Sequence, residues 1–168
     1  MRRSVKRLGV GMFAGAIIGA GLAAPAAAVG APYPDTTKYQ RVSDLVKYRV
    51  VDEDGIWFTT PLGLTCGIGD DGSYGCSGVL PGAPFGDNEV GWFPGDSFPR
   101  LYRADELRFN SGRTQSILIG EAYVDYRGSR CAVSSDSLVY CIHGNDPNSQ
   151  LAVNSSMTWR GADAEPST

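Results

Sequence analysis

The stretch of sequence that decides the fold is Cys66-Gly-Ile-Gly-Asp-Asp-Gly-Ser-Tyr-Gly-Cys76. Its centre, Asp70-Asp71-Gly72, suits a three-residue hairpin loop in which a type I turn is followed by a left-handed glycine. With that loop, Cys66 and Cys76 face each other across two antiparallel strands. Non-hydrogen-bonded Cα atoms there lie about 4.5 Å apart, within reach of a disulfide. The stretch therefore predicts a β-hairpin closed by its own disulfide.

Cys131 and Cys141 repeat the spacing of nine intervening residues, with Asp136 at the midpoint as Asp71 is in the first segment. The second loop, 135–137, is Ser-Asp-Ser and lacks the glycine. Four cysteines permit three pairings, and the spacing favours Cys66–Cys76 and Cys131–Cys141. Each bridge would stabilise the fold by up to about 3 kcal/mol in the chain-entropy model. Paired thiols of this kind are typical of an oxidising compartment rather than of a metal site or a nucleophile.

The N-terminus has the three parts of a secretory signal peptide. Four cations among the first seven residues precede residues 8–24, which carry no charge, and an Ala-Ala-Ala cleavage site follows at 26–28. We expect cleavage after Ala28, with cleavage after Ala31 as the alternative. A retained membrane anchor is a second alternative, because the uncharged stretch approaches the roughly 20 residues that span a bilayer. The glycines in the stretch and its alanine-rich exit favour cleavage.

The pattern along the chain predicts one domain. Residues 1–28 form the signal peptide with its N-terminal signal helix, 29–40 a flexible leader, 41–160 the β-rich domain and 161–168 a disordered tail. We expect an all-β fold, a small antiparallel β sandwich or barrel-like domain stapled by disulfides. The Pro- and Gly-rich stretch Pro81–Pro99 reads as a long irregular excursion, and Arg103–Phe109 fits either a short helix or a strand. Strands are predicted outside the cysteine hairpins at Leu45–Val51, Ile56–Thr60, Ile117–Ile119, Ala122–Tyr126, Leu151–Val153 and Met157–Trp159.

The charge of the exported domain excludes one class of partner. The chain has 15 basic and 18 acidic residues, and four of the basic ones precede the cleavage site, so the exported part carries a net charge of −7. A surface this negative repels nucleic acid and anionic lipid. We therefore expect no nucleic-acid partner, and contact with a membrane only through an uncleaved signal. We also expect a monomer.

Two segments resemble a known family. Residues 57–66, Trp-Phe-Thr-Thr-Pro-Leu-Gly-Leu-Thr-Cys, resemble the opening motif F-x-[ST]-P-[SG]-G-N-I-x-C of small secreted actinobacterial, mycobacterial-type proteins with paired cysteines. Residues 138–141 and 151–153 are similar to that family's closing segment. The sequence departs from the pattern at Leu64 and Gln150. The resemblance implies export, disulfides and β structure, and because the family is functionally uncharacterised it implies no catalytic residue.

One Gly-Asp-Ser segment and the one histidine are the polar features that could carry out chemistry. Gly95-Asp96-Ser97-Phe98 is similar to the nucleophile block of Gly-Asp-Ser-Leu esterases, which also needs a histidine with an aspartate just before it. His143 is the only histidine, and Tyr140 stands three positions before it, so an ordinary Asp-Ser turn is the favoured interpretation. One histidine cannot build a zinc site when the cysteines are oxidised. We predict no catalytic residue, no metal ligand and no cofactor.

The remaining candidates are aromatic side chains in and near the irregular excursion. Rings on a loop framed by Gly and Pro form either a flat shelf for a sugar or peptide, or a cap that folds back on the core. The cap is the commoner arrangement. The candidate ligand-binding residues are Phe85, Trp92, Phe93, Phe98 and Tyr102.

These observations lead to a ranked set of functional hypotheses. The first is a secreted, non-enzymatic domain that binds or stabilises a partner in the cell envelope or extracellular space. The second is a small secreted hydrolase that uses carboxylates, and the third is a membrane-retained surface protein.

Overall fold

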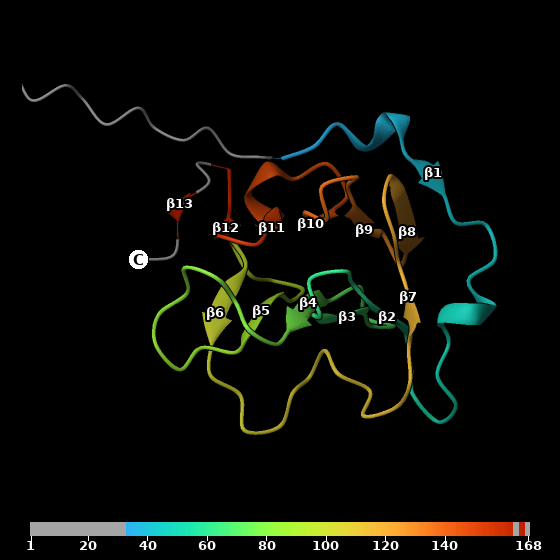
Figure 1. The fold of residues 1–168 in the computed structure, drawn as a ribbon, viewed down its shortest axis with the longest axis horizontal. Coiled ribbons are helices and arrows are strands. Elements are labelled where there is room, and N and C mark those ends of the chain that lie inside the picture. Colours follow the sequence, from blue (N-terminus) through green and yellow to red (C-terminus); the bar gives the residue numbers. More distant parts are fainter. Residues whose placement is uncertain (1–32, 163–164, 167–168) are drawn as a thin grey trace, which may run out of the picture.

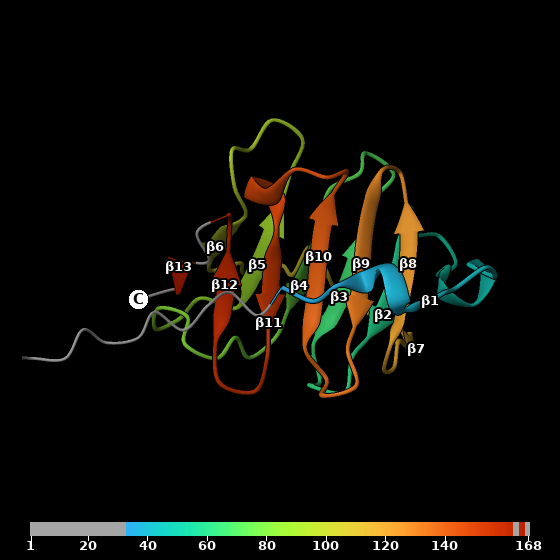
Figure 2. The same ribbon diagram turned by 90° about the horizontal axis from the view of Figure 1, so that it is seen from above.

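The computed structural model describes residues 33–162 and 165–166. Two β-sheets lie face to face, and the short helical turns lie outside them (Figures 1 and 2). The fold is therefore all-β, as predicted, and of the two arrangements expected from the sequence it is the sandwich. The predicted signal helix lies outside the described residues. Within the described part, no helix combines the length and the apolar character needed to cross a membrane.

The two sheets share one topology over six strands, and β13 is a seventh strand in one of them. The seven-stranded sheet runs β1-β8-β9-β10-β11-β12-β13, and the six-stranded sheet runs β7-β2-β3-β4-β5-β6. The elements are η1 Thr36–Lys38, β1 Gln40–Arg41, η2 Val46–Tyr48, β2 Ile56–Thr59, β3 Thr65–Ile68, β4 Tyr74–Ser77, β5 Glu89–Trp92, β6 Arg100–Tyr102, β7 Ser116–Ile117, β8 Ala122–Tyr126, β9 Ser129–Val133, β10 Val139–His143, η3 Pro147–Ser149, β11 Leu151–Val153, β12 Thr158–Arg160 and β13 Glu165–Pro166.

Each sheet is built from an antiparallel meander and one strand borrowed from the other half of the chain. Strands β2 to β6 and strands β8 to β12 are the two meanders. The strand before each meander pairs, in parallel, with the first strand of the other one: β1 with β8, and β7 with β2. Both sheets are therefore mixed, with one parallel pair added to the predicted antiparallel strands of each. This exchange ties the halves together through backbone hydrogen bonds as well as through the core.

Both cysteine hairpins form as predicted. The first has the register expected from its turn, with Cys66 opposite Cys76 and Gly67 opposite Gly75. Gly72 has a φ of +85°, the left-handed conformation that the loop requires. The bridges Cys66–Cys76 and Cys131–Cys141 have Cα separations of 4.1 and 4.2 Å.

The core lies between the sheets, and both disulfides belong to it. All four cysteines are fully buried among apolar side chains from both meanders. A disulfide placed there restrains the chain and also fills core volume. The largest fully buried side chains are Tyr74, Phe58, Phe109, Ile56, Leu64, Ile68, Leu118 and Leu151.

A row of glycines crosses the six-stranded sheet. Gly67, Gly75 and Gly91 are cross-strand neighbours on β3, β4 and β5. A Cβ on Gly75 would lie 2.3 Å from the Phe109 ring, and one on Gly67 would lie 2.6 Å from Trp57. The row therefore leaves room for two aromatic rings on the sheet, and Phe109 anchors the long segment between β6 and β7. That segment includes residues 103–109, for which neither of the predicted elements forms beyond turns and bends.

Two predicted segments differ in the structure. Leu45–Val51 contains the 3-10 turn η2 instead of a strand, because the Asp44 carboxylate accepts from the Val46 amide and a tight turn inserts Tyr48 against Phe58. The prediction that Pro81–Pro99 is irregular is wrong at its centre, where β5 pairs with strands on both sides. The prolines flank this strand without entering it.

Both ends of the domain extend beyond the predicted boundaries. Residues 33–40 were assigned to the leader, but they contain η1 and the first residue of β1, and the Tyr33 hydroxyl donates to the Gly161 carbonyl at 2.5 Å. In the predicted tail, β13 pairs with β12, with Glu165 opposite Arg160. Long-range contacts, which the local sequence does not signal, join Tyr33, β1 and β13 to the rest of the seven-stranded sheet.

Candidate functional site

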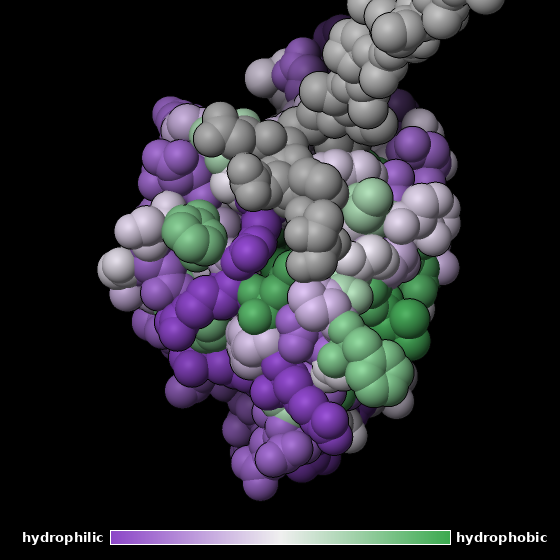
Figure 3. Space-filling model, turned by 90° about the vertical axis from the view of Figure 1, so that its left-hand side faces the viewer, coloured by the Kyte–Doolittle hydropathy of each residue, from purple (hydrophilic) through white to green (hydrophobic). Residues whose placement is uncertain are grey.

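A groove of about 860 Å³ opens beside β6. Every residue of β6 lines it, together with the loop that follows β5, the tip of the first cysteine hairpin and one side chain from β12. Figure 3 views the end of the sandwich that carries β6 and β13, where hydrophilic side chains surround smaller hydrophobic areas. The lining residues are Asp71, Phe93, Pro94, Arg100, Leu101, Tyr102, Glu106, Arg108 and Arg160.

Arginines and aromatic rings dominate the chemistry of the groove. The guanidinium carbons of Arg100 and Arg108 lie over the Phe93 ring, 4.9 and 4.5 Å from its centroid. Phe93 also packs against Tyr102, with centroids 6.4 Å apart. Contact with a ring face positions a guanidinium while leaving its N–H groups available. Three of the arginines of this acidic protein thus face one groove.

A buried carboxylate holds the wall of the groove. Glu89 is the only charged side chain that is fully buried in the described part of the chain. Its two oxygens accept from the Tyr102 hydroxyl at 2.7 Å and from the Arg108 amide at 2.8 Å. Burial, and next the hydrogen bond to Glu89, raise the pKa of Tyr102, so this phenol stays a donor. Glu89 therefore holds two of the residues that line the groove, Tyr102 and Arg108.

The two acids of the lining are placed differently. Asp71 accepts from the Ser73 amide at 2.9 Å and lies 3.8 Å from Arg108, and its hydrogen bonds to Ser73 are the main cause that lowers its pKa. It is a carboxylate that remains ionised and caps a turn. Glu106, in the segment that follows β6, is exposed. Arg100 has its own partner in Asp96, at 2.8 Å.

The five predicted aromatic residues do not form one shelf. Trp92, at the centre of the Pro81–Pro99 stretch, is 7% exposed and stacks between Tyr74 and His143, at 5.6 and 4.6 Å. For this residue the cap and not the shelf forms, because β5 turns its side chain into the core. Phe85 and Phe98 are exposed, at 107% and 51%, outside the groove lining. Phe93 and Tyr102 are half-buried and do line it.

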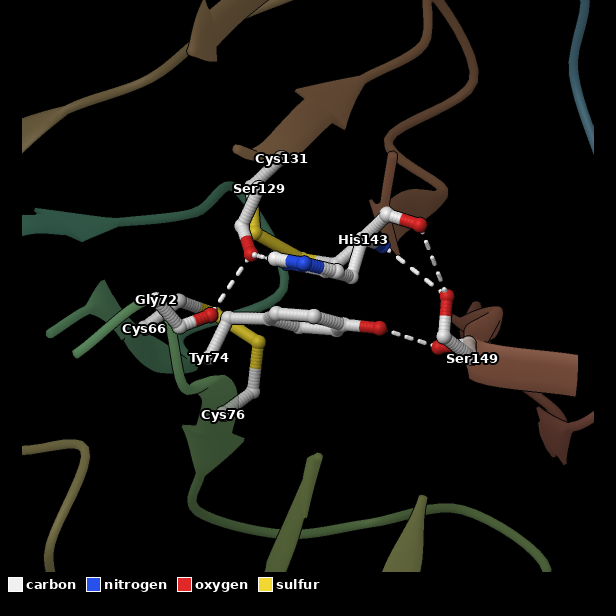
Figure 4. The surroundings of a disulfide bond; sticks show 9 residues. Cys66, Gly72, Tyr74, Cys76, Ser129, Cys131, His143 and Ser149 are labelled. Atoms are coloured by element: carbon white, nitrogen blue, oxygen red, sulfur yellow. Dashed lines mark hydrogen bonds between the residues drawn. A yellow bond between two sulfur atoms is a disulfide. The ribbon is translucent and has the colours of Figure 1, made fainter. Parts of the chain in front are cut away.

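His143 belongs to a clasp between the sheets (Figure 4). The Ser129 hydroxyl lies 2.6 Å from the Gly72 carbonyl and 2.8 Å from Nδ1 of His143. Because the carbonyl can only accept, the serine proton points to Gly72, and Nδ1 of His143 carries the proton it donates to Ser129. The His143 amide also donates to Ser149, whose carbonyl accepts from the Tyr74 hydroxyl. The sequence did not signal this role, since His143 stood out there only as the one histidine of the chain.

The clasp does not have the form of a nucleophile and base. A serine nucleophile must give its proton to the histidine, and here the proton points away from the ring. Ser129 is also 1% exposed. The Gly-Asp-Ser-Phe segment forms a turn in which Asp96 pairs with Arg100, and Ser97 is exposed. The geometry thus assigns Ser129 a structural role.

The groove is the strongest candidate for a binding site, and three comparisons add nothing to it. No protein-family profile, curated protein or solved structure matches this chain. The search of residues 33–162 and 165–166 for groups of three or more His, Cys, Asp or Glu that suit a metal ion found none. The resemblance to secreted actinobacterial proteins stays a prediction.

Proposed function

We propose that this protein is a secreted, non-enzymatic binding domain that holds an envelope or extracellular partner in the groove beside β6. The observation that carries the proposal is the placement of Arg100 and Arg108 over Phe93, with Arg160 facing them from the other sheet. Arginines arranged on aromatic rings and left more than half exposed are typical of recognition surfaces.

The environment of the domain supports export. Two fully buried disulfides indicate an oxidising, extracellular setting. The predicted signal peptide is consistent with secretion into that setting.

The groove favours binding over hydrolysis. A hydrolase that uses two carboxylates needs one of them to act as an acid with a raised pKa. Asp71 has the opposite shift, toward the ionised form, and Glu106 is exposed. Glu89 has both oxygens engaged and lies behind Tyr102. Asp71 lies beside the Arg108 guanidinium and Glu89 holds the Arg108 backbone, so these two acids help to position an arginine.

The test is capture of partner from envelope fractions by the exported protein. We expect R100A/R108A to lower recovery about tenfold, since these side chains offer charge-assisted contacts. The matched control is R113A, which removes an exposed arginine three residues before β7, at the opposite edge of the same sheet. Equal recovery by wild type, R100A/R108A and R113A, with unchanged melting temperatures, would exclude the groove as the binding site.

A further inference from the structure

The two sheets differ at one edge. Strand β12 of the seven-stranded sheet has β13 beside it, whereas β6, its topological counterpart, is the last strand of its sheet in the described part of the chain. The outer side of β6 therefore offers backbone donors and acceptors for one more strand. An exposed sheet edge of this kind is the template for β-strand addition by a peptide.

The side chains at this edge select the charge of an added strand. Arg100 and Tyr102 alternate with Leu101, so they share one face of β6, and Leu101 packs toward the core. Arg100 pairs in register with Gly91, and a Cβ added to Gly91 would point to the Phe109 ring on the outer face of the sheet. A strand next to β6 would place alternate side chains beside Arg100 on that face. Opposite charges in such cross-strand positions attract.

The chain itself shows the kind of segment that fits. Beside β12, the partner strand is Glu165–Pro166, part of an acidic C-terminal segment, with Glu165 opposite Arg160 in the register. At β6, the same register would place an acidic residue of the added strand opposite Arg100.

We propose that the partner is another protein that adds an extended, acidic segment beside β6, with acidic residues at alternate positions facing the groove. The inference rests on the function proposed above and names the class of partner. Backbone pairing supplies the orientation, and Arg100 and Arg108 supply the preference for acidic side chains.

The first experiment measures fluorescence anisotropy of a labelled peptide of alternating Glu and Val with the exported protein. Binding is expected to weaken about tenfold when alternate amides are N-methylated, which keeps the charge and removes strand pairing. Replacing Glu by Lys should abolish binding. R100A should weaken binding about fivefold to tenfold, while R113A leaves it unchanged. Equal binding of the methylated and unmethylated peptides would overturn strand addition.

Two further arms separate other occupants. Competition by a carboxylated polysaccharide that equals the competition by unlabelled peptide would show a charge site for glycans and overturn the proposal. Self-association in sedimentation velocity that disappears when residues 163–168 are removed would assign the edge to a second copy of this chain, which also overturns it. If the peptide fails in every form while envelope capture still depends on R100A/R108A, the proposed function stands and this inference falls.

Discussion

Replacing Ser129 by alanine tests whether the clasp between the sheets stabilises the sandwich. The hydroxyl is buried. It lies 2.6 Å from the Gly72 carbonyl, in the loop between β3 and β4, and 2.8 Å from the ring of His143 on β10 of the other sheet. Alanine removes both hydrogen bonds and leaves the carbonyl and the ring nitrogen without this partner. The change in volume is small, so the loss reports hydrogen bonding and not a cavity.

Each buried polar group left unpaired costs about 1–3 kcal/mol. For two groups, one of which is partly exposed, we expect S129A to lower the free energy of unfolding by about 2–4 kcal/mol. In a domain of this size 1 kcal/mol corresponds to about 4 °C, so the melting temperature should fall by about 8–16 °C.

The assay is thermal and urea unfolding of S129A, H143F and the double variant, with S156A as an exposed serine control. H143F keeps a ring against Trp92 and removes the hydrogen bond. Because the two side chains share one interaction, their effects should be non-additive by about 1–2 kcal/mol. A melting temperature of S129A within about 1 °C of wild type, or strictly additive losses, would refute the clasp.

Three other predictions concern the disulfide Cys131–Cys141, the glycine row and the stability of the fold at acid pH. C131A/C141A should lower the free energy of unfolding by about 2–4 kcal/mol in urea titrations, since the bridge restrains the unfolded chain and fills the core; an unchanged midpoint would contradict this. G75A should destabilise by at least about 2 kcal/mol, because its Cβ would meet a phenyl ring at 2.3 Å, and a stable G75A would show that the ring moves freely. The hydrogen bonds from Ser73 hold the pKa of Asp71 below its unfolded value, so the stability they provide is present above about pH 4 and is lost as the pH falls through the folded pKa. D71N should therefore lose less stability than wild type in melting curves from about pH 5 to pH 2. The same loss of stability in both proteins would count against the assignment.

The sequence predicted the parts of the fold that depend on near neighbours. The turn residues between Cys66 and Cys76 set a register that places the two sulfurs opposite each other, and the structure has that register. Strand-forming residues also located Ala122–Tyr126 and Leu151–Val153. By contrast, Pro and Gly on either side concealed β5, because a four-residue strand in the middle of a sheet is stabilised by its two neighbours and not by its own propensity.

The candidate site could not be predicted from the local sequence for the same reason. Of the five aromatic residues chosen from the sequence, Phe93 and Tyr102 do line the groove. Nothing in the sequence signals that Arg100, Arg108 and Arg160 share it, since the last comes from the other sheet. Trp92 is a large aromatic residue of the kind that often anchors a surface contact, but the structure buries it in the core.

By itself, the sequence determined two disulfide-closed hairpins and an all-β domain, because those features follow from turn chemistry and residue spacing within about a dozen positions. Tertiary structure alone decided the exchange of β1 and β7, the clasp at His143 and the gathering of arginines beside β6. These features join residues that are tens of positions apart. Such contacts form only when the burial of a shared core repays the entropy of closing long loops, and no local pattern records which loops will close.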